Sequence, residues 1–344
     1  MARIGGLAVA AALVGAAFAQ GVARGEDVAD FYRGKTLAIA VGYGPGGGYD
    51  LAARTLAKHL GRHIPGQPQI VVRNMPGAGS VLAANYLHST APRDGSVIGS
   101  TNDAMLIAPL IKLQGVQFDP REFHWLGSMA SRGTPIVYAR SDGPARTFEE
   151  ARRNVVLIGA TGPDATASYP AMLNELLGAK FKVVLGYKGG TAEINLAIAR
   201  GEVHGRASLE WQSLKHYQPD WVANKFVTVL IQMGLKPHPE LADVPSAFDL
   251  AKNDEQRQIM ELVLGTGQFL RAFSTPPGVP AERLAALRAA FQQTVVDPDF
   301  VRDMSQVSPL DVEYASPHSI EAFLERVYKF PPHVVEQAAR FVGQ

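Results

Sequence analysis

Short apolar runs alternate with amphipathic stretches along most of this chain, and glycines stand at many of the changeovers. Residues 37–41 are continuously apolar, which predicts a buried strand, whereas the apolar positions of residues 50–60 recur with the spacing of a helix. The same plan repeats with strands at 69–73 and 96–100, a loop at 74–79 and a helix at 80–88. This alternation predicts an α/β protein built around largely parallel sheets.

The plan restarts after about residue 125, which predicts a second lobe. Its predicted elements are strands at 155–160, 181–185 and 226–231, loops at 161–166 and 186–190, and helices at 168–177 and 191–199. The last third of the chain has a predicted strand at 268–274 and helices at 280–296 and 319–341. We expect this third to complete the first lobe. Lobe 1 then comprises residues 26–127 and 230–344, and lobe 2 comprises residues 128–229. Two crossing strands join the lobes, and the ligand cleft lies between them.

The first 25 residues differ from the rest. A short positive start at Met1–Arg3 is followed by an unbroken run of apolar and small residues and by an A-x-A sequence at residues 17–19. This is the pattern of a secretory signal peptide, and the run is short for a membrane span. We therefore predict an exported, periplasmic protein with a cleaved signal peptide at residues 1–25 and no direct insertion into the membrane.

Charge and cysteine content exclude several classes of partner and site. The 33 basic and 32 acidic residues leave a formal net charge of +1, so nothing favours nucleic acid as a partner. No cysteine is present, which excludes disulfides, thiolate metal sites and a lipid-modified N-terminal cysteine. No cofactor or metal is expected: His59 and His63 stand four apart, but without the companion glutamate of a zinc motif they indicate a solvated helix end. We expect a monomer.

Two glycine-rich loops carry most of the functional signal. Residues 42–48 (GYGPGGG) lie between a predicted strand and a predicted helix, and Gly77, Ala78 and Gly79 belong to a similar loop after the next strand. Glycines let the backbone approach a ligand closely, and the amides at a helix N-terminus favour an anion. We expect the two loops to converge on one crevice that binds an acid group. Tyr43 and Tyr49 lie within or beside the first loop and are expected to line it, whereas Asp50 and Arg54 are expected to support it.

These loops resemble those of a known family, the periplasmic receptors of tripartite tricarboxylate transporters, also called Bug solute-binding proteins. Residues 41–54 (VGYGPGGGYDLAAR) resemble the family's strand, x-P-G-G-x-x-D turn and A-R helix start, and residues 72–80 (VRNMPGAGS) resemble its N-R-P-G-A-G loop. Further similarities follow at residues 91–101, 186–190, 200–203, 243–246 and 276–280, so that the resemblance covers nearly the whole mature chain.

The resemblance implies a two-lobed type II periplasmic binding protein fold that closes around a small organic carboxylate. It also implies membrane permease subunits as partners and no enzymatic activity. By position, the residues implied to contact or surround the carboxylate are Gly44, Gly46, Gly47, Asn74, Ala78, Gly79 and Thr101 in lobe 1, and Thr161, Gly162 and Thr166 in lobe 2.

The chain departs from the family pattern at two places in the second lobe. Val203 is followed by His204, Gly205 and Arg206 where an acidic residue is usual, and residues 161–164 (TGPD) replace a serine pattern. We hypothesise that Arg206 pairs with a second carboxylate or another polar end of the ligand, since a guanidinium binds carboxylates well. A structural ion pair is the alternative. The identity of the ligand stays open.

Two other functions fit parts of the sequence. Gly42, Gly44 and Gly47 also fit the G-x-G-x-x-G fingerprint of an NADP-dependent oxidoreductase, but the second strand ends in Arg73 and Asn74, without the acidic residue that binds a ribose hydroxyl. A ligand sensor for a membrane signalling protein is the other alternative, and sequence alone does not separate it from a transport receptor.

Overall fold

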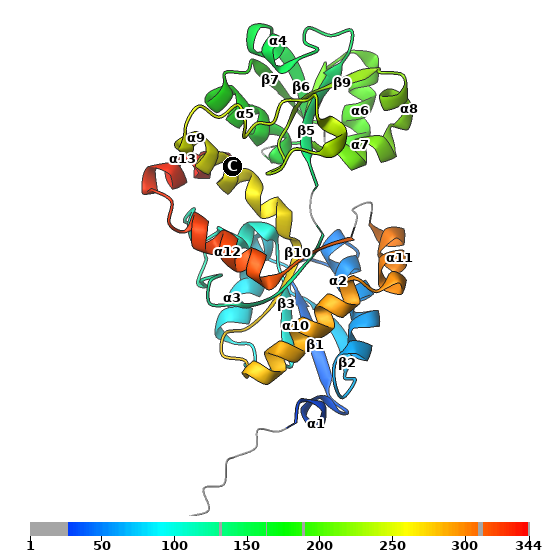
Figure 1. The fold of residues 1–344 in the computed structure, drawn as a ribbon, viewed down its shortest axis with the longest axis vertical. Helices are drawn as coiled ribbons and strands as arrows, with labels where there is room; N and C mark the ends of the chain where they lie inside the picture. The colour runs from blue at the N-terminus through cyan, green and yellow to red at the C-terminus, as the bar shows by residue number, and fades with distance from the viewer. Residues whose placement is uncertain (1–26, 131–132, 163, 188–189, 309–311, 343–344) are drawn as a thin grey trace, which may run out of the picture.

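The computed structural model describes residues 27–342 except 131–132, 163, 188–189 and 309–311. It contains two sheets, one in each lobe, with helices on both faces (Figure 1). The predicted signal peptide lies outside the described residues. Within the part of the chain that is described, no helix combines the length and the apolar character needed to cross a membrane.

The first sheet has the strand order β11-β4-β10-β3-β1-β2. Its strands are β1 (Thr36–Val41), β2 (Gln69–Asn74), β3 (Val97–Ser100), β4 (His124–Ala130), β10 (Leu270–Thr275) and β11 (Val312–Ala315). Strand β1 pairs in parallel with both β2 and β3, whereas β10, β4 and β11 join the other edge by antiparallel pairs. Five of the six residues of β1 are buried, as expected for a parallel strand covered on both faces.

Helices cover both faces of this sheet. On one face, apolar residues of β1 share a core with α2 (Gly48–Leu60) and α10 (Ala281–Val295). The neighbouring α11 (Pro298–Val307) packs against α2. The opposite face is covered by α3 (Val81–Ser89) and α12 (Pro317–Val327). The C-terminal third therefore completes the first sheet, because β10, β11, α10 and α12 all belong to it.

The second sheet has the order β7-β6-β8-β5-β9. Its strands are β5 (Pro135–Arg140), β6 (Val156–Ala160), β7 (Phe181–Leu185), β8 (Gly205–Glu210) and β9 (Val227–Gln232). The helices of this lobe are α4 (Phe148–Arg153), α5 (Ala165–Leu177), α6 (Thr191–Arg200), α7 (Trp211–Tyr217) and α8 (Pro219–Ala223). Both sheets are mixed rather than largely parallel, because the strands next to the two crossings, β4, β5, β9 and β10, all pair antiparallel.

The chain passes from the first sheet to the second between β4 and β5, and returns between β9 and β10. The return includes α9 (Asp254–Leu264), which packs against α13 (Pro332–Val342) beside the second lobe (Figure 1). Helix α13 also contacts α5, where Arg340 Nη2 donates to Glu175 Oε1 at 2.7 Å. The single helix predicted at 319–341 is wrong: it is divided into α12 and α13 by Pro331 and Pro332, since proline cannot continue a helix.

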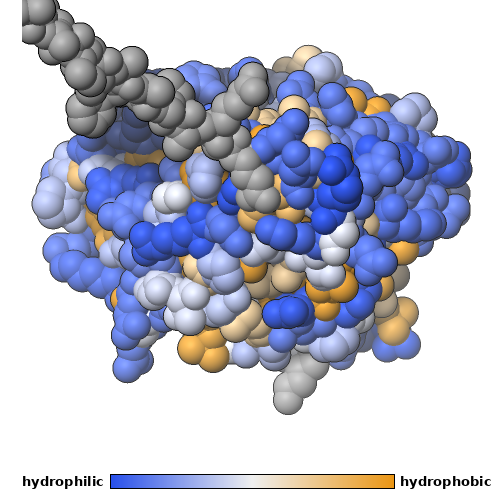
Figure 2. Space-filling view, turned by 90° about the horizontal axis from the view of Figure 1, so that it is seen from below, coloured by the Kyte–Doolittle hydropathy of each residue, from blue (hydrophilic) through white to orange (hydrophobic). Residues whose placement is uncertain are grey.

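The end of the molecule seen from below the first lobe is mostly hydrophilic (Figure 2). Its hydrophobic residues occur in small groups among polar ones, which is ordinary for a protein surface.

Candidate functional site

The two glycine-rich loops lie side by side, as predicted, because they follow neighbouring parallel strands. Val41 at the end of β1 is paired with Asn74 at the end of β2, and the amide of Met75 donates to the carbonyl oxygen of Val41 at 2.7 Å. Adjacent parallel strands present their carboxyl ends at the same edge of a sheet, which is where α/β proteins place ligands. The first requirement for a shared site is therefore met.

The first loop is held in shape by the side chain of Asp50. Its Oδ2 accepts hydrogen bonds from the amide of Gly46 at 2.8 Å and from Arg54 Nε at 2.9 Å, so the predicted supporting role of Asp50 and Arg54 is confirmed. Asn74 Nδ2 donates to Asp50 Oδ1 at 2.8 Å and to the carbonyl oxygen of Tyr43 at 2.9 Å. Asn74 and the Gly46 amide, both predicted to contact the ligand, are thus engaged within the protein.

Burial by itself would raise the pKa of Asp50, but the hydrogen bonds from Arg54, Gly46 and Asn74 outweigh it and lower the pKa to about 2. The carboxylate is therefore ionised at neutral pH. The negative charge of Asp50 therefore stabilises the first loop, and it engages the Gly46 amide, which is then not free to bind a ligand.

The second loop has an unusual backbone. Gly77, Ala78, Gly79 and Ser80 all have positive φ, at 156°, 45°, 62° and 90°. Such conformations are uncommon for residues with a side chain, and they occur where the surrounding structure enforces them. Ala78 and Gly79 are exposed at the start of α3, so their backbone is accessible to a ligand.

Two tyrosines connect the first loop to the 3-10 helix η3 (Asp103–Leu106) that follows β3. Tyr43 and Tyr49 stack with their ring centroids 4.8 Å apart. Asn102 Nδ2 donates to the Tyr43 hydroxyl at 2.5 Å, and the Tyr49 hydroxyl donates to Asp103 Oδ1 at 3.1 Å. The rings therefore link the glycine loop to the residues that line the neighbouring cavity.

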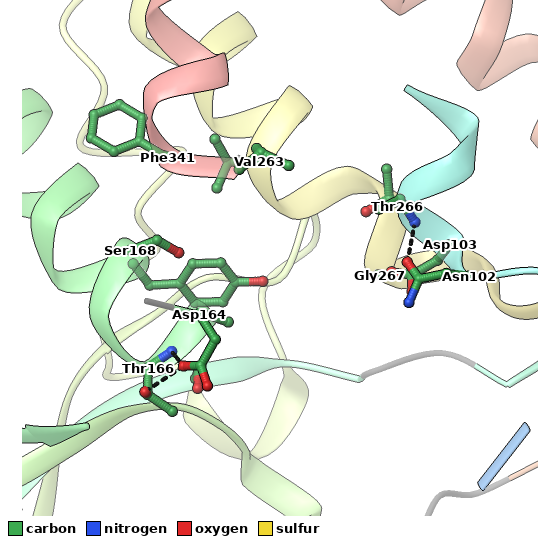
Figure 3. A pocket seen from close by; sticks show the side chains of 14 residues that line it. Asn102, Asp103, Asp164, Thr166, Ser168, Val263, Thr266, Gly267 and Phe341 are labelled. Atoms are coloured by element: carbon green, nitrogen blue, oxygen red, sulfur yellow. Dashed lines mark hydrogen bonds between the residues drawn. The ribbon is translucent and has the colours of Figure 1, made fainter. Parts of the chain in front are cut away.

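A cavity of about 530 Å³ lies between the lobes (Figure 3). Its wall combines η3 of lobe 1, the start of α5 in lobe 2, and the α9 and α13 helices. Its lining residues are Asn102, Asp103, Ala104, Asp164, Ala165, Thr166, Ser168, Tyr169, Ser208, Val263, Thr266, Gly267, Phe341 and Val342. Among the predicted site residues, Thr166 lines this cavity, Thr101 is a buried neighbour of the lining residue Asn102, and the glycine-rich loops are not part of the described lining.

The second-lobe loop is organised by Asp164, a residue that the sequence reasoning did not select. Asp164 Oδ1 accepts from the amide of Thr166 at 2.8 Å and from its hydroxyl at 2.5 Å, and Oδ2 accepts from the Thr161 hydroxyl. Asp164 is thus the N-cap of α5, as Figure 3 shows. An aspartate directly before a predicted helix is the signal that could have identified it.

Burial would raise the pKa of Asp164, but the hydrogen bonds from Thr161 and Thr166 prevail and lower it. Its negative charge therefore faces the cavity beside Thr166. Gly162 in the same loop accepts a hydrogen bond from the amide of the lining residue Asp164 at 2.9 Å, and a Cβ at this position would have no neighbour within 4 Å, so the loop leaves open space there.

Arg206 is 4% exposed on β8, and its Nε and Nη1 atoms are buried without a hydrogen-bond partner in the described structure. Burial lowers its pKa, an effect that the nearby groups of Tyr138, Glu210 and Asp164 oppose. No ion pair of Arg206 is present among the described residues, so the alternative of a structural ion pair receives no support. An unpaired buried guanidinium is costly in a folded protein, and Arg206 itself is not among the residues that line the described cavity.

The two histidines of α2 and its C-terminal turn do not form a metal site, and no cluster of metal-binding side chains occurs elsewhere in the described ranges. His59 is not solvated as predicted: it is 5% exposed, and its Nε2 lies 3.0 Å from Asp303 Oδ2. His63 Nε2 lies 3.3 Å from Asp297 Oδ2. Both histidines therefore connect α2 and its C-terminal turn to the region of α11.

Comparisons with known proteins agree with this architecture. The family model described as "Tripartite tricarboxylate transporter family receptor" matches residues 52–329. A UPF0065 protein of Cupriavidus necator, encoded in the gbd 5' region, is 24% identical over 343 residues, which cover 96% of this chain and 95% of that protein.

Two solved structures share the fold. A solute-binding protein from Polaromonas, described as TctC and solved without a ligand, has a TM-score of 0.68 at 18% identity, covering 89% of this chain and 99% of its own. MatC from Rhodopseudomonas palustris, solved with bound malate, has a TM-score of 0.54 at 18% identity, with coverage of 89% and 99%.

Proposed function

The chain belongs to the family of tripartite tricarboxylate transporter receptors, and from that premise we propose that it captures a small organic carboxylate between its two lobes. Members of this family are solute-binding receptors and not enzymes, so the oxidoreductase alternative is set aside. The single observation that carries the carboxylate proposal is Arg206, a buried guanidinium with two unpartnered nitrogen atoms on β8, the strand whose Ser208 lines the interlobe cavity.

One acid group of the ligand is bound by the backbone of the first lobe. Gly44 and Gly47 of the first loop and Gly77, Ala78 and Gly79 of the second present accessible backbone next to the N-termini of α2 and α3. Charge-assisted hydrogen bonds to such amides contribute about 1.5–3 kcal/mol each, so a few of them account for micromolar binding. In this proposal Asn74 and Gly46 act indirectly, because Asp50 already binds both.

The other end of the ligand is bound by the second lobe. Arg206 pairs with a second carboxylate, and Thr161, Gly162 and Thr166 surround it. Support comes from the position of Arg206 on β8, two residues before the cavity-lining Ser208, and from its electrostatic attraction to Asp164 of the neighbouring loop. The malate bound to the structurally similar MatC carries two such acid groups.

Ligand capture brings the two lobes together. The expected division into residues 26–127 with 230–344 and residues 128–229 cuts through β4 and β9, so we place the two boundaries after β4 and after β9, where the chain crosses between the sheets. Closure about the crossings would bring the first-lobe loops toward Arg206, as in other two-domain binding proteins.

The biological setting follows from the family. We propose that the protein works in the periplasm after its signal peptide is cleaved, as a monomer, and delivers its ligand to membrane permease subunits of a tripartite transporter. The membership of the chain in this receptor family supports this setting.

A thermal-shift screen against a library of mono-, di- and tricarboxylates, with malate included, tests the proposal. A ligand at 100 times its Kd stabilises the folded protein by about 2.7 kcal/mol, which raises the Tm by several degrees. Isothermal titration then measures the affinity of each acid that shifts the Tm. If no acid in the library shifts the Tm while amides or amines do, the carboxylate proposal is wrong.

A further inference from the structure

Arg271 is a second buried arginine, and it lies in the first lobe. It is 7% exposed on β10, and its φ of 59° is in the left-handed region. A long side chain in this conformation within a strand is strained, and strained residues cluster at ligand sites. Strain alone assigns no role, so the surroundings of the guanidinium decide the question.

The guanidinium of Arg271 is directed at the N-terminus of α2. Its Nη2 lies 3.4 Å from the position that a Cβ at Gly48 would occupy, and Gly48 is the first residue of that 13-residue helix. Its Nη1 donates to Ser308 Oγ at 3.0 Å. Among the described residues, no other hydrogen bond and no carboxylate partner satisfies Arg271.

This arrangement is only partly compensated in the ligand-free protein, because the ionised Asp50 in the first turn of α2 is engaged by the amide of Gly46 and by Arg54 and, among the described residues, forms no ion pair with Arg271. The N-terminus of a helix carries the positive end of the helix dipole, which favours anions and disfavours cations. Arg271 adds a full positive charge at that end, in a buried position where burial lowers its pKa despite the opposing effect of Tyr49. An anion placed between Arg271 and the first turn of α2 would reduce the cost of burying this charge.

We propose that Arg271 is a ligand-binding residue of the first lobe, whose guanidinium and the N-terminal amides of α2 together receive one acid group of the ligand. This inference rests on the proposed function and adds a cationic side chain to a subsite otherwise built from backbone. The site is reached through the first glycine loop, because Gly46, Gly47 and Gly48 are exposed. Arg271 thereby makes the receptor select an acid over the corresponding amide.

The test compares Arg271→Met and Arg271→Lys with wild type, and uses Arg257→Met, at an exposed arginine on α9, as the matched control. Two quantities are measured for each protein: the Tm without ligand, and the Kd for the acid that binds wild type best. For Arg271→Met we expect the Tm without ligand to stay the same or rise, and the Kd to increase about ten- to hundredfold. Arg271→Lys keeps the charge and should lose less affinity, and Arg257→Met should change neither quantity.

The two measurements separate ligand binding from a purely structural role. A structural arginine would lower the Tm of Arg271→Met and leave the Kd of the folded protein unchanged, and either result overturns the inference. If wild type binds no carboxylate, the proposed function has failed. The Tm without ligand still tests Arg271, because a Tm below that of wild type in both Arg271 variants overturns the electrostatic argument. Should Arg271→Met fail to fold, its loss of structure counts against the inference in the same way.

Discussion

The hydroxyl of Ser80 donates a hydrogen bond to the carbonyl oxygen of Gly42 at 3.3 Å, and this contact joins the second glycine loop to the first. The same oxygen atom of Ser80 accepts from the amide of Asn102 at 3.2 Å. Through these two hydrogen bonds the fully buried Ser80, in the loop after β2, connects the segments that follow β1 and β3. The relative position of the two loops depends on this side chain.

Gly42→Ala should destabilise the protein by about 1–3 kcal/mol, because the added Cβ would overlap the side chain of Ser80. Chemical unfolding monitored by circular dichroism measures the loss. The double variant Gly42→Ala with Ser80→Gly should recover part of it, since the glycine removes the overlapping atoms and readily adopts the φ of 90° at that position. Equal losses in the single and double variants would contradict this account of the contact.

Asp50→Asn should lower the free energy of unfolding at pH 7 by about 1–3 kcal/mol, because the ionised carboxylate accepts hydrogen bonds from Arg54, Gly46 and Asn74. Its pKa of about 2 in the folded protein is below the value of about 3.9 in an unfolded chain. The stabilisation is therefore present above pH 4 and is lost as the pH falls toward 2.

Urea unfolding at several pH values checks this. The difference in stability between wild type and Asp50→Asn should shrink steadily between pH 4 and pH 2. A difference that does not depend on pH would mean that the charge of Asp50 contributes nothing. Leu51→Ile, on the adjacent position of the same helix, serves as a control without a titrating group.

Arg206→Met should raise the free energy of unfolding of the ligand-free protein by about 1 kcal/mol or more, because it removes a buried charge that has no ion-pair partner in the described structure. The same variant should weaken binding of a dicarboxylate more than binding of a monocarboxylate. Calorimetric titrations with a matched pair of acids measure the two losses. Equal losses would show that Arg206 does not contact the second acid group.

Asp164→Ser should leave stability nearly unchanged, since serine and aspartate are comparable N-cap residues for α5. It removes a negative charge from the cavity wall, so an anionic ligand should bind about two- to tenfold more tightly. Asp164→Ala, which removes the cap as well, should cost about 1 kcal/mol of stability. Weaker binding of acids by Asp164→Ser would contradict this expectation. It would indicate that the carboxylate of Asp164 binds a cationic group of the ligand.

The strands and helices near the glycine loops were predictable because buried parallel strands are continuous apolar runs and the helices have regularly spaced apolar residues. Residues 37–41 and 181–185 were placed within one residue of β1 and β7. Strands β4 and β5 were missed. Strand β4 contains His124 and Gly127 and is followed by another strand instead of a helix, and β5 begins with Pro135 and is followed only by the six-residue helix α4. Helix α9 was also missed, because it lies outside the repeating strand and helix pattern.

The site was predictable only where local sequence determines it. The pairing of Asp50 with Arg54 follows from a spacing of four residues on one helix, and it is present. The burial of Arg206 and Arg271 without carboxylate partners depends on contacts between distant segments, and the positive φ of Arg271 has no sequence signal. Helix α13 likewise lines the cavity because of packing between distant segments, which sequence patterns do not reveal.

Helix α13 has a consequence for how the protein is made. It contributes Phe341 and Val342 to the cavity wall and contacts α5, which lies more than 150 residues earlier in the chain. During synthesis or export, both glycine loops and Arg206 therefore emerge well before α13, which completes the cavity wall. We expect solute capture to begin only after residues 332–342 have docked, so that unfinished molecules do not withdraw ligand from the pool.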